Sequence, residues 1–260
     1  MKAKRCGALW TLCGLAIASI TSTTPASAQA AEVKEKPPMY TYVANWSIPR
    51  ARWADMDKQA SVNQKTLDGG LSGGGLVGYG FDENLVHEND GDTHDTFWSG
   101  MSMASVLGVL DELRKASTTS PVLNSATKHY DSLLVSRYYN WKSGSVKGGY
   151  THGAMYKLKA DAPDDALDTL SKSLIVPLLE KLLASGAIQE YEVDTQAIHT
   201  MASETFWIYY IAQTADGVDK VNAALRESLK ANVLAGPAFG SMVDSTGHRD
   251  FLARTNATYK

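Results

Sequence analysis

The chain is poor in cysteine: its 260 residues include two, Cys6 and Cys13, and both stand close to the N-terminus. If this N-terminal region is removed, the remaining chain has no thiol chemistry, no disulfide and no cysteine ligand for a metal. A disulfide-stabilised miniprotein is therefore excluded. A hydrophobic core must hold the fold together, and the length of the chain allows a large one.

The chain also lacks an excess of positive charge, with 25 Lys and Arg against 28 Asp and Glu and a net charge of −3. Without a basic surface to neutralise phosphates, nucleic acid is excluded as a partner. The sequence has no Gly-Lys-Ser/Thr phosphate loop, no Gly-x-Ser-x-Gly elbow, no His-Glu-x-x-His and no EF-hand loop. The glycine run at 69–75 follows an expected helix instead of preceding one, which predicts a flexible loop.

The N-terminus has the three-part pattern of an export signal. Three basic residues precede an uncharged apolar run at 8–20, and two Ala-x-Ala cleavage sites follow within 26–30. The basic residues are Lys2, Lys4 and Arg5. This pattern predicts a signal peptide at 1–30, a short exported segment at 31–38, and a periplasmic or secreted protein. An uncleaved anchor is the alternative. Removal of the three positive charges leaves −6 on the remainder, and no second long apolar run predicts a membrane span.

The remaining sequence is repeated internally. Residues 78–87 match 190–199 at an offset of 112, and residues 129–133 match 248–252 at an offset of 119. Further matches join 94–98 to 203–207, Tyr42 to Tyr156, and Pro49 to Pro163. Four blocks in one order predict a duplication, since self-similarity at a fixed period is typical of repeated units.

Each copy has a strand–helix–strand–strand–helix–strand pattern. The expected strands of the first copy are 40–46, 76–87, 94–99 and 131–139, and its helices are 47–67 and about 100–116. The expected strands of the second copy are 154–160, 188–198, 205–212 and 251–258, and its helices are 165–184, kinked at Pro177, and 216–230. We therefore predict an α+β fold with ferredoxin-like repeats at 39–142 and 153–260, joined by a linker at 143–152.

The repeated order and the strand character resemble the dimeric α/β-barrel superfamily, which includes cofactor-free monooxygenases and EthD-like, NIPSNAP-like and stress-responsive barrel proteins. The resemblance implies that two ferredoxin-like units close one barrel. In relatives the units are usually two subunits, so two copies on one chain predict a monomer with an intrachain barrel. The resemblance rests on no signature motif, so it transfers no catalytic residue. A haem-degrading branch of the superfamily is disfavoured, because it would need a helix histidine and the second helix of each copy lacks one. We predict no bound cofactor.

Two histidines flank a predicted hairpin turn at Asp90-Gly91. A two-residue turn would place His87 directly opposite His94 on the paired strands, with Cβ atoms about 4.5–5.5 Å apart. Two imidazoles at that distance are a candidate metal site. A surface pair at the end of a hairpin is the alternative.

A His-x-Asp pair begins the last strand of each copy. The four residues are His129 and Asp131 in the first copy and His248 and Asp250 in the second. A spacing of two places both side chains on one face, and a carboxylate beside an imidazole supports general-base catalysis. Anchoring of the strand is the alternative. Asp82 and Asp194 also recur at matched strand positions, as candidate acid–base groups or as partners of a nearby loop.

Aromatic residues on the predicted strands are candidates for a ligand pocket. They are Tyr42, Trp46, Tyr79, Trp98, Tyr191 and Trp207. The same residues could fill an ordinary core between sheet and helices, and the matched positions of Trp98 and Trp207 favour that alternative. Three functions remain open: an exported protein that binds a small apolar or aromatic molecule, a cofactor-free enzyme acting on such a molecule, and a histidine-based metal binder.

Overall fold

The computed structural model describes residues 33–86 and 91–260. The elements of the first repeat are β1 (Met39–Ser47), η1 (Arg50–Arg52), α1 (Trp53–Ser72), β2 (Gly78–Asn84), β3 (His94–Gly100), α2 (Met103–Ser117), η2 (Leu123–Ser125) and β4 (Lys128–Trp141). Those of the second repeat are β5 (Gly144–Leu158), α3 (Ala166–Leu170), the π-helical turn η3 (Ser171–Ile175), α4 (Val176–Ser185), β6 (Glu190–Gln196), β7 (Thr205–Ala212), α5 (Ala215–Ala231), α6 (Ala235–Met242) and β8 (Val243–Tyr259).

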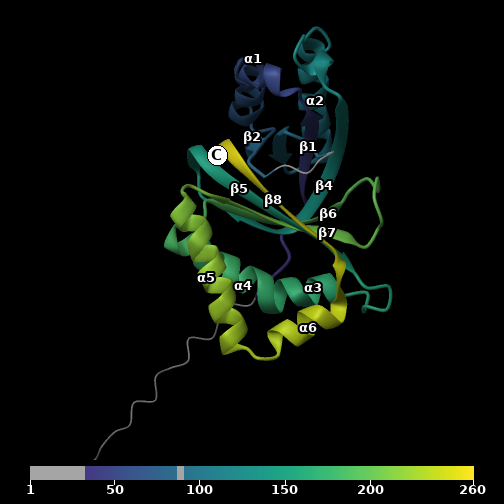
Figure 1. Cartoon of the computed structure of the whole chain (residues 1–260), viewed down its shortest axis with the longest axis vertical. Coiled ribbons are helices and arrows are strands. Elements are labelled where there is room, and N and C mark those ends of the chain that lie inside the picture. The colour runs from purple at the N-terminus through teal and green to yellow at the C-terminus, as the bar shows by residue number, and fades with distance from the viewer. Residues whose placement is uncertain (1–32, 87–90) are drawn as a thin grey trace, which may run out of the picture. The chain divides into compact units, whose positions relative to one another are not determined.

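The eight strands form one closed antiparallel barrel in the order β1-β3-β2-β8-β5-β7-β6-β4 (Figure 1). Within each repeat the first strand lies between the third and the fourth, which is the ferredoxin-like arrangement. Two ladders, β2–β8 and β4–β6, join the repeats and close the barrel. The predicted α+β fold with a duplicated ferredoxin-like unit is confirmed.

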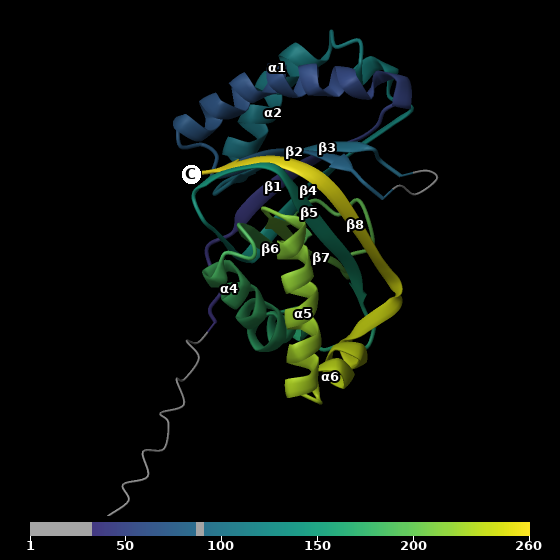
Figure 2. The same ribbon diagram turned by 60° about the vertical axis from the view of Figure 1, so that its left-hand side comes forward.

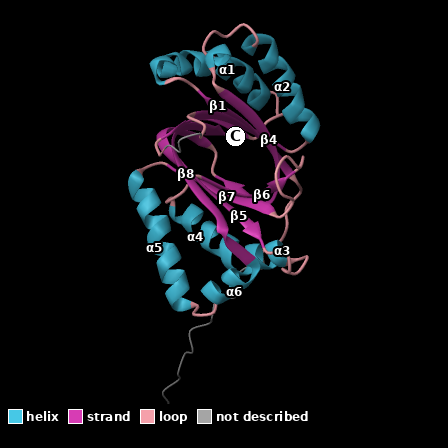
Figure 3. Cartoon of the chain, turned by 45° about the vertical axis from the view of Figure 1, so that its right-hand side comes forward, coloured by secondary structure: helices cyan, strands magenta, loops and turns pink. Residues whose placement is uncertain are grey.

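Helices cover the barrel on two sides. α1 and α2 pack on the sheet of the first repeat, and α3 to α6 pack on that of the second (Figures 2 and 3). Polar caps fix two helix starts: the Ser102 hydroxyl accepts a hydrogen bond from the Ser105 amide, and the Thr214 hydroxyl accepts one from the Gly217 amide. No helix in the described part of the chain is long and apolar enough to cross a membrane.

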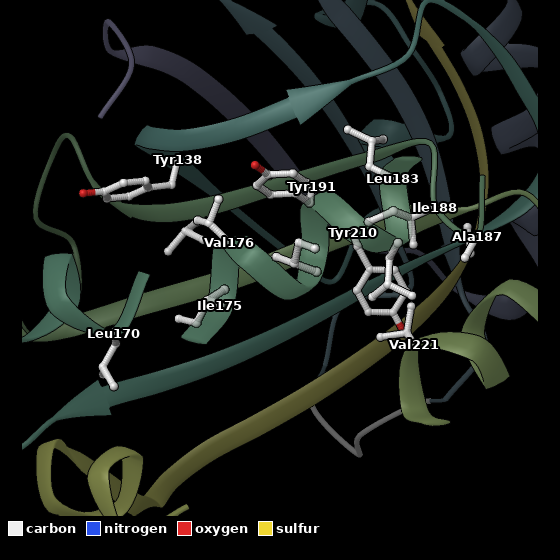
Figure 4. Packing of buried hydrophobic residues seen from close by; sticks show 14 of the residues in the cluster. Tyr138, Leu170, Ile175, Val176, Leu183, Ala187, Ile188, Tyr191, Tyr210 and Val221 are labelled. Carbon is white, nitrogen blue, oxygen red and sulfur yellow. The ribbon is translucent and has the colours of Figure 1, made fainter. Parts of the chain in front are cut away.

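The apolar side chains of each sheet alternate between the helices and the barrel interior. In the second repeat Tyr191 and Tyr210 pack against Leu183 and Val221 from the helices (Figure 4). Their neighbours along the strands face inward, as period-two alternation requires. Phe81 and Val193 pack with the two helix-side cores, which leaves the adjacent Asp82 and Asp194 on the other face, as the alternation predicts.

Several predicted boundaries were wrong. Residues 144–152, predicted as part of a linker, belong to β5, so Lys142 and Ser143 alone separate the two repeats. The helix predicted at 165–184, with a kink at Pro177, is instead divided into α3, η3 and α4. Proline has no amide hydrogen to donate to the preceding turn, and the π-helical turn lies directly before it. α6 was not predicted.

The predicted hairpin register was also wrong. His94 on β3 lies opposite Glu83 on β2, not opposite His87. The Asn84 backbone amide donates to the Thr93 carbonyl at 2.9 Å and its side chain donates to the Asp92 carbonyl at 3.0 Å, so the pairing is shifted by four residues from the predicted register. The Leu85 amide then donates to the Leu252 carbonyl of β8 at 2.8 Å, which continues the β2–β8 pairing one residue beyond Asn84. His87 itself lies outside the described residues.

The predicted signal peptide at 1–30 lies outside the described residues and stays a prediction. Part of the following segment, 31–38, is described and packs on β4. The Lys36 amide donates to the Arg137 carbonyl at 2.8 Å, and its ammonium group donates to the Tyr139 carbonyl at 2.7 Å.

Candidate functional site

Two cavities lie on opposite faces of the first repeat's sheet. The helix-side cavity, about 380 Å³, lies between that sheet and helices α1 and α2. The barrel cavity, about 680 Å³, is lined by the inward side chains of the barrel strands. Both fall within or near the range of volumes that hold small organic molecules, roughly 300–1,000 Å³.

His129 lies at the helix-side cavity and has two polar partners. Its Nδ1 lies 2.9 Å from the Asn45 carbonyl oxygen, and its Nε2 lies 3.4 Å from Asp131 Oδ1. Because a carbonyl only accepts, Nδ1 carries a proton and Nε2 faces the carboxylate. The imidazole stacks on Trp46 with ring centroids 3.6 Å apart. The predicted pair His129 and Asp131 is thus brought together beside a cavity.

Tyr42 extends this cluster along β1. Its ring stacks on Trp98 with centroids 4.7 Å apart, and both residues line the helix-side cavity. Burial and then the nearby Asp131 carboxylate raise the pKa of the Tyr42 hydroxyl, which therefore stays protonated at neutral pH. Arg114 of α2 lines the same cavity and acts on Tyr42 in the opposite direction.

The second repeat contains the same cluster. The His248 Nδ1 lies 3.1 Å from the Met155 carbonyl oxygen, its Nε2 lies 3.2 Å from Asp250 Oδ2, and its ring stacks on Tyr156 at 4.4 Å. His152 takes the place of Tyr42: it stacks on Tyr210 at 5.0 Å and lies 3.6 Å from Asp250. Burial lowers the pKa of His152.

The strand registers prove these positions equivalent and correct two predicted matches. Trp46 lies opposite His129 in the β1–β4 ladder, and it corresponds to Tyr156, so the match of Tyr42 with Tyr156 was wrong by four residues. Trp98 corresponds to Tyr210, so the match of Trp98 with Trp207 was wrong by three. An odd slip moves a side chain to the other face: Trp98 faces the helices, whereas Trp207 lines the barrel cavity.

The two clusters differ in what covers them. Phe239 of α6 packs edge to face on Tyr156 at 5.3 Å. At the same place in the first repeat, between the second helix and the last strand, stands the three-residue turn η2, whose Leu123 and Asn124 line the helix-side cavity without filling it. Trp46, the equivalent of Tyr156 in the first repeat, lines the helix-side cavity instead. Repetition of the histidine geometry supports the anchoring role of both His-x-Asp pairs. The helix-side cavity is lined by both residues of the first pair and by neither residue of the second, although Asp250 lines the barrel cavity.

The six predicted pocket aromatics do not form one site. Tyr42, Trp46 and Trp98 line the helix-side cavity, and Trp207 lines the barrel cavity. Tyr79 and Tyr191 line neither. Their hydroxyls donate to helix carboxylates, to Asp68 at 2.5 Å and to Glu180 at 2.6 Å, so they join sheet to helix.

The predicted metal site needs His87 opposite His94, but His94 lies opposite Glu83. His94 lines the helix-side cavity, contacts Thr93 Oγ1 at 2.9 Å through Nδ1, and lies edge to face with Trp53 at 5.3 Å. Within residues 33–86 and 91–260, no three His, Cys, Asp or Glu side chains are arranged to hold a metal ion.

Seven carboxyl groups line the barrel cavity, and all but Asp92 and Asp250 are buried. Three of the five buried ones were not singled out from the sequence. The five are Asp82 of β2, Asp95 of β3, and Glu190, Glu192 and Asp194 of β6. All are at most 7% exposed. The alternation of acids with Tyr191 and Val193 was the available signal, because alternate residues of a strand share a face.

Burial raises the pKa of all five carboxyl groups. It raises that of Asp82 to about 7 and that of Glu192 to about 6, against hydrogen bonds that lower both. For Asp95, Glu190 and Asp194 the neighbouring carboxylates raise the pKa further, well above the usual range. The interior therefore holds protons that exposed carboxylates would release.

No family model matches the chain, and no curated protein matches it in sequence. Solved structures match it over most of its length. A candidate monooxygenase from Lactobacillus acidophilus has a TM-score of 0.60 at 11% identity and covers 86% of this chain and 97% of its own. A candidate monooxygenase from Fusobacterium nucleatum has a TM-score of 0.61 at 7% identity, with 86% and 95% covered. An anthrone oxidase-like protein has a TM-score of 0.51 at 10% identity, with 86% and 94% covered.

The chain has the dimeric α/β-barrel fold. The predicted resemblance is confirmed at this level, and identities of 7–11% show the fold alone. Since one fold hosts many functions, the function of this protein has to be argued from its own cavities.

Proposed function

We propose that this exported protein binds a small, largely aromatic molecule in the helix-side cavity. The observation that carries the proposal is the asymmetry between the repeats. The same aromatic and histidine cluster occurs twice, but the first copy lines a cavity of about 380 Å³ and α6 covers the second. Packing alone would not leave such a space, because protein interiors are close-packed.

The lining supports a ligand that is apolar with one polar group. Tyr42, Trp46 and Trp98 offer ring faces and edges, which pack on another aromatic ring in stacked or edge-to-face contact. Arg114 and the His129–Asp131 pair offer donors and an acceptor at the same cavity. A few polar groups in an apolar cavity fix the orientation of a ligand.

Filling the cavity tests this proposal. Ala60 of α1 lines the cavity, whereas Ala54 on the same helix is exposed and lies outside it. We expect Ala60→Phe to abolish binding of 2-naphthol measured by calorimetry, and Ala54→Phe to leave it unchanged. Equal binding by both variants, or no binding by the unaltered protein, would reject a ligand site at this cavity.

A cofactor-free enzyme is the second candidate. The Asp131 carboxylate contacts His129 and influences the Tyr42 hydroxyl, so a proton taken from a bound C–H or O–H group could rest on this pair. Two of the structures that share the fold are candidate monooxygenases, and a third is an anthrone oxidase-like protein.

Oxygen uptake separates the two candidates. With anthrone as the probe, oxidation to anthraquinone consumes one O₂ and releases one water. If the protein is an enzyme, Asp131→Asn slows this uptake while binding persists, and Asp250→Asn in the second repeat does not slow it. Binding without oxygen uptake leaves the first candidate.

A further inference from the structure

The barrel cavity has a strong charge imbalance. Its five buried carboxyl groups come from β2 and β3 on one wall and from β6 on the other, since β1 and β4 separate them in the barrel order. Asp82 and Asp95 are direct neighbours across the β2–β3 ladder. The basic residues lining this cavity are Lys128 and Arg249, and both are exposed. Among the described residues, no buried basic side chain lines the cavity.

Polar groups of the barrel satisfy part of this cluster. Thr41 donates to Glu192 Oε2 at 2.9 Å, and Thr151 donates to Asp82 Oδ1 at 3.1 Å. In contrast, both carboxyl oxygens of Asp194 and the Oε1 of Glu190 are buried without a hydrogen-bond partner. Asp194 is 1% exposed and Glu190 is 2% exposed. Glu190 and Asp194 share protons with the neighbouring Glu192, but among the described residues no N–H group donates to these three oxygens. Since buried polar atoms are nearly always paired, a ligand with N–H donors would replace those shared protons with charge-assisted hydrogen bonds.

The remainder of the lining is aromatic. Its rings are Phe97, Trp207, Tyr209, Phe251 and Tyr259. Ring faces attract a cation within about 6 Å, and they also pack against an apolar body. A cavity of about 680 Å³ is far larger than a metal ion needs. The described residues also hold no metal-binding set of three ligands.

We propose that the barrel cavity binds an organic cation, a protonated amine on an aromatic or apolar body, with Asp194 and Glu190 as the groups that accept its hydrogen bonds. This site lies on the opposite face of the sheet from the proposed helix-side site. Asp82 and Asp95 line both cavities, but Glu190 and Asp194 line the barrel cavity alone, so the proposal does not rest on the helix-side one. The cavity reaches solvent where Met201 and Tyr130, both exposed, line its edge. The carboxyl groups hold protons at mildly acidic pH, and a bound cation favours their ionised form, so they release protons when it binds.

A matched series of probes tests the charge. The probes are 2-phenylethylammonium, the neutral 2-phenylethanol and the anionic 3-phenylpropionate, titrated calorimetrically into the Ala60→Phe protein to block the helix-side cavity. We expect the amine to bind about tenfold or more tightly than the alcohol, as for a hydrogen bond to a charged group, and the anion not to bind. At pH 6 the amine should release protons, seen as a heat that depends on the buffer.

Two variants assign the residues. Asp194→Asn should reduce the affinity for the amine to within about twofold of the affinity for the alcohol. Asp216 is an exposed acid on α5, and Asp216→Asn should leave both affinities unchanged. The preference for the amine is measured on protein whose barrel cavity is unaltered, so misfolding of Asp194→Asn would not affect that measurement. Equal binding of amine and alcohol, an equal effect of Asp216→Asn, or displacement of the amine by micromolar Zn²⁺ or Ca²⁺ would overturn the proposal.

Discussion

Asp82 on β2 lies directly opposite Asp95 on β3, and both carboxyl groups lie in the interior of one barrel. Like charges at directly opposed positions destabilise a sheet. The sheet tolerates this pair because burial and mutual repulsion keep protons on the interior acids.

The stability of the protein should therefore fall as the pH rises. The unfolded chain releases these protons near pH 4, whereas folding holds them to about pH 6 for Glu192 and about pH 7 for Asp82. The folded state thus binds more protons between pH 4 and 7, and the free energy of unfolding decreases across that window. We expect a lower Tm at pH 8 than at pH 5, measured by calorimetry.

The groups that face these acids set the size of this effect. Glu190, Glu192 and Asp194 face them from β6, and the hydroxyls of Tyr209 and Tyr259, whose pKa values burial raises, stay neutral. His152, whose pKa burial lowers, acts in the opposite direction but is one group against five. Asp194→Asn should flatten the pH dependence and Asp216→Asn should not. A Tm that rises steadily from pH 5 to 8 would contradict the prediction.

The fold was predictable because strand alternation and internal duplication can both be recognised in the sequence alone. The matches at 78–87 and 129–133 identified equivalent strands, and the structure confirms both offsets through the ladders around Asp82 and Asp194. The register of β3 was not predictable in the same way. The motif Thr-Phe-Trp recurs in β7, but shifted by three residues, so its rings exchange faces.

The cavities depended on packing that the sequence does not encode locally. The aromatic residues of β1 were identified, but whether they are covered depends on the segment before the last strand, which is the helix α6 in the second repeat and the short turn η2 in the first. The interior acids illustrate the same limit. Glu190, Glu192 and Asp194 read as the polar face of a half-exposed strand until closure of the barrel buries that face.

A second prediction concerns the close approach of Phe251 to Gly153. The two residues are opposite each other on β8 and β5, and a Cβ added at Gly153 would overlap the rings of Phe251 and Tyr209. Gly153→Ala should therefore push these rings into the barrel cavity and reduce stability by about 1–3 kcal/mol. In Gly108→Ala, on the exposed side of α2, an added Cβ meets nothing within 4 Å. That control should gain roughly 0.5–1 kcal/mol from helix propensity. Denaturant unfolding of both variants measures the difference, and an unchanged Gly153→Ala would show that the rings move freely.

A third prediction concerns export. The basic start, the apolar run and the paired Ala-x-Ala sites predict cleavage before Gln29 or Ala31. N-terminal sequencing of protein recovered outside the cytoplasm should return one of these residues. An intact Met1 on protein recovered from the cytoplasm would reject the signal peptide. Replacing Ala28 by a bulky residue such as Tyr removes a small residue shared by both sites, and should slow processing.

The last prediction is that the barrel closes within one chain and that the protein is a monomer. The β2–β8 ladder pairs Gly78–Asn84 with Ala253–Tyr259, and β4 pairs with β6 on the other side, so each repeat completes the sheet of the other. A separate repeat would expose the edges of two strands together with its interior acids and aromatic rings, a surface prone to association. Because the repeats share one chain, their docking proceeds at an effective concentration that is millimolar for short linkers. Light scattering should therefore show a monomer for the whole chain. Residues 39–142 or 143–260 expressed alone should aggregate or dimerise, and the two halves coexpressed should form a soluble one-to-one complex through the same ladders. A stable monomeric half would contradict this view, since that half would have to be folded with half of a barrel open to water.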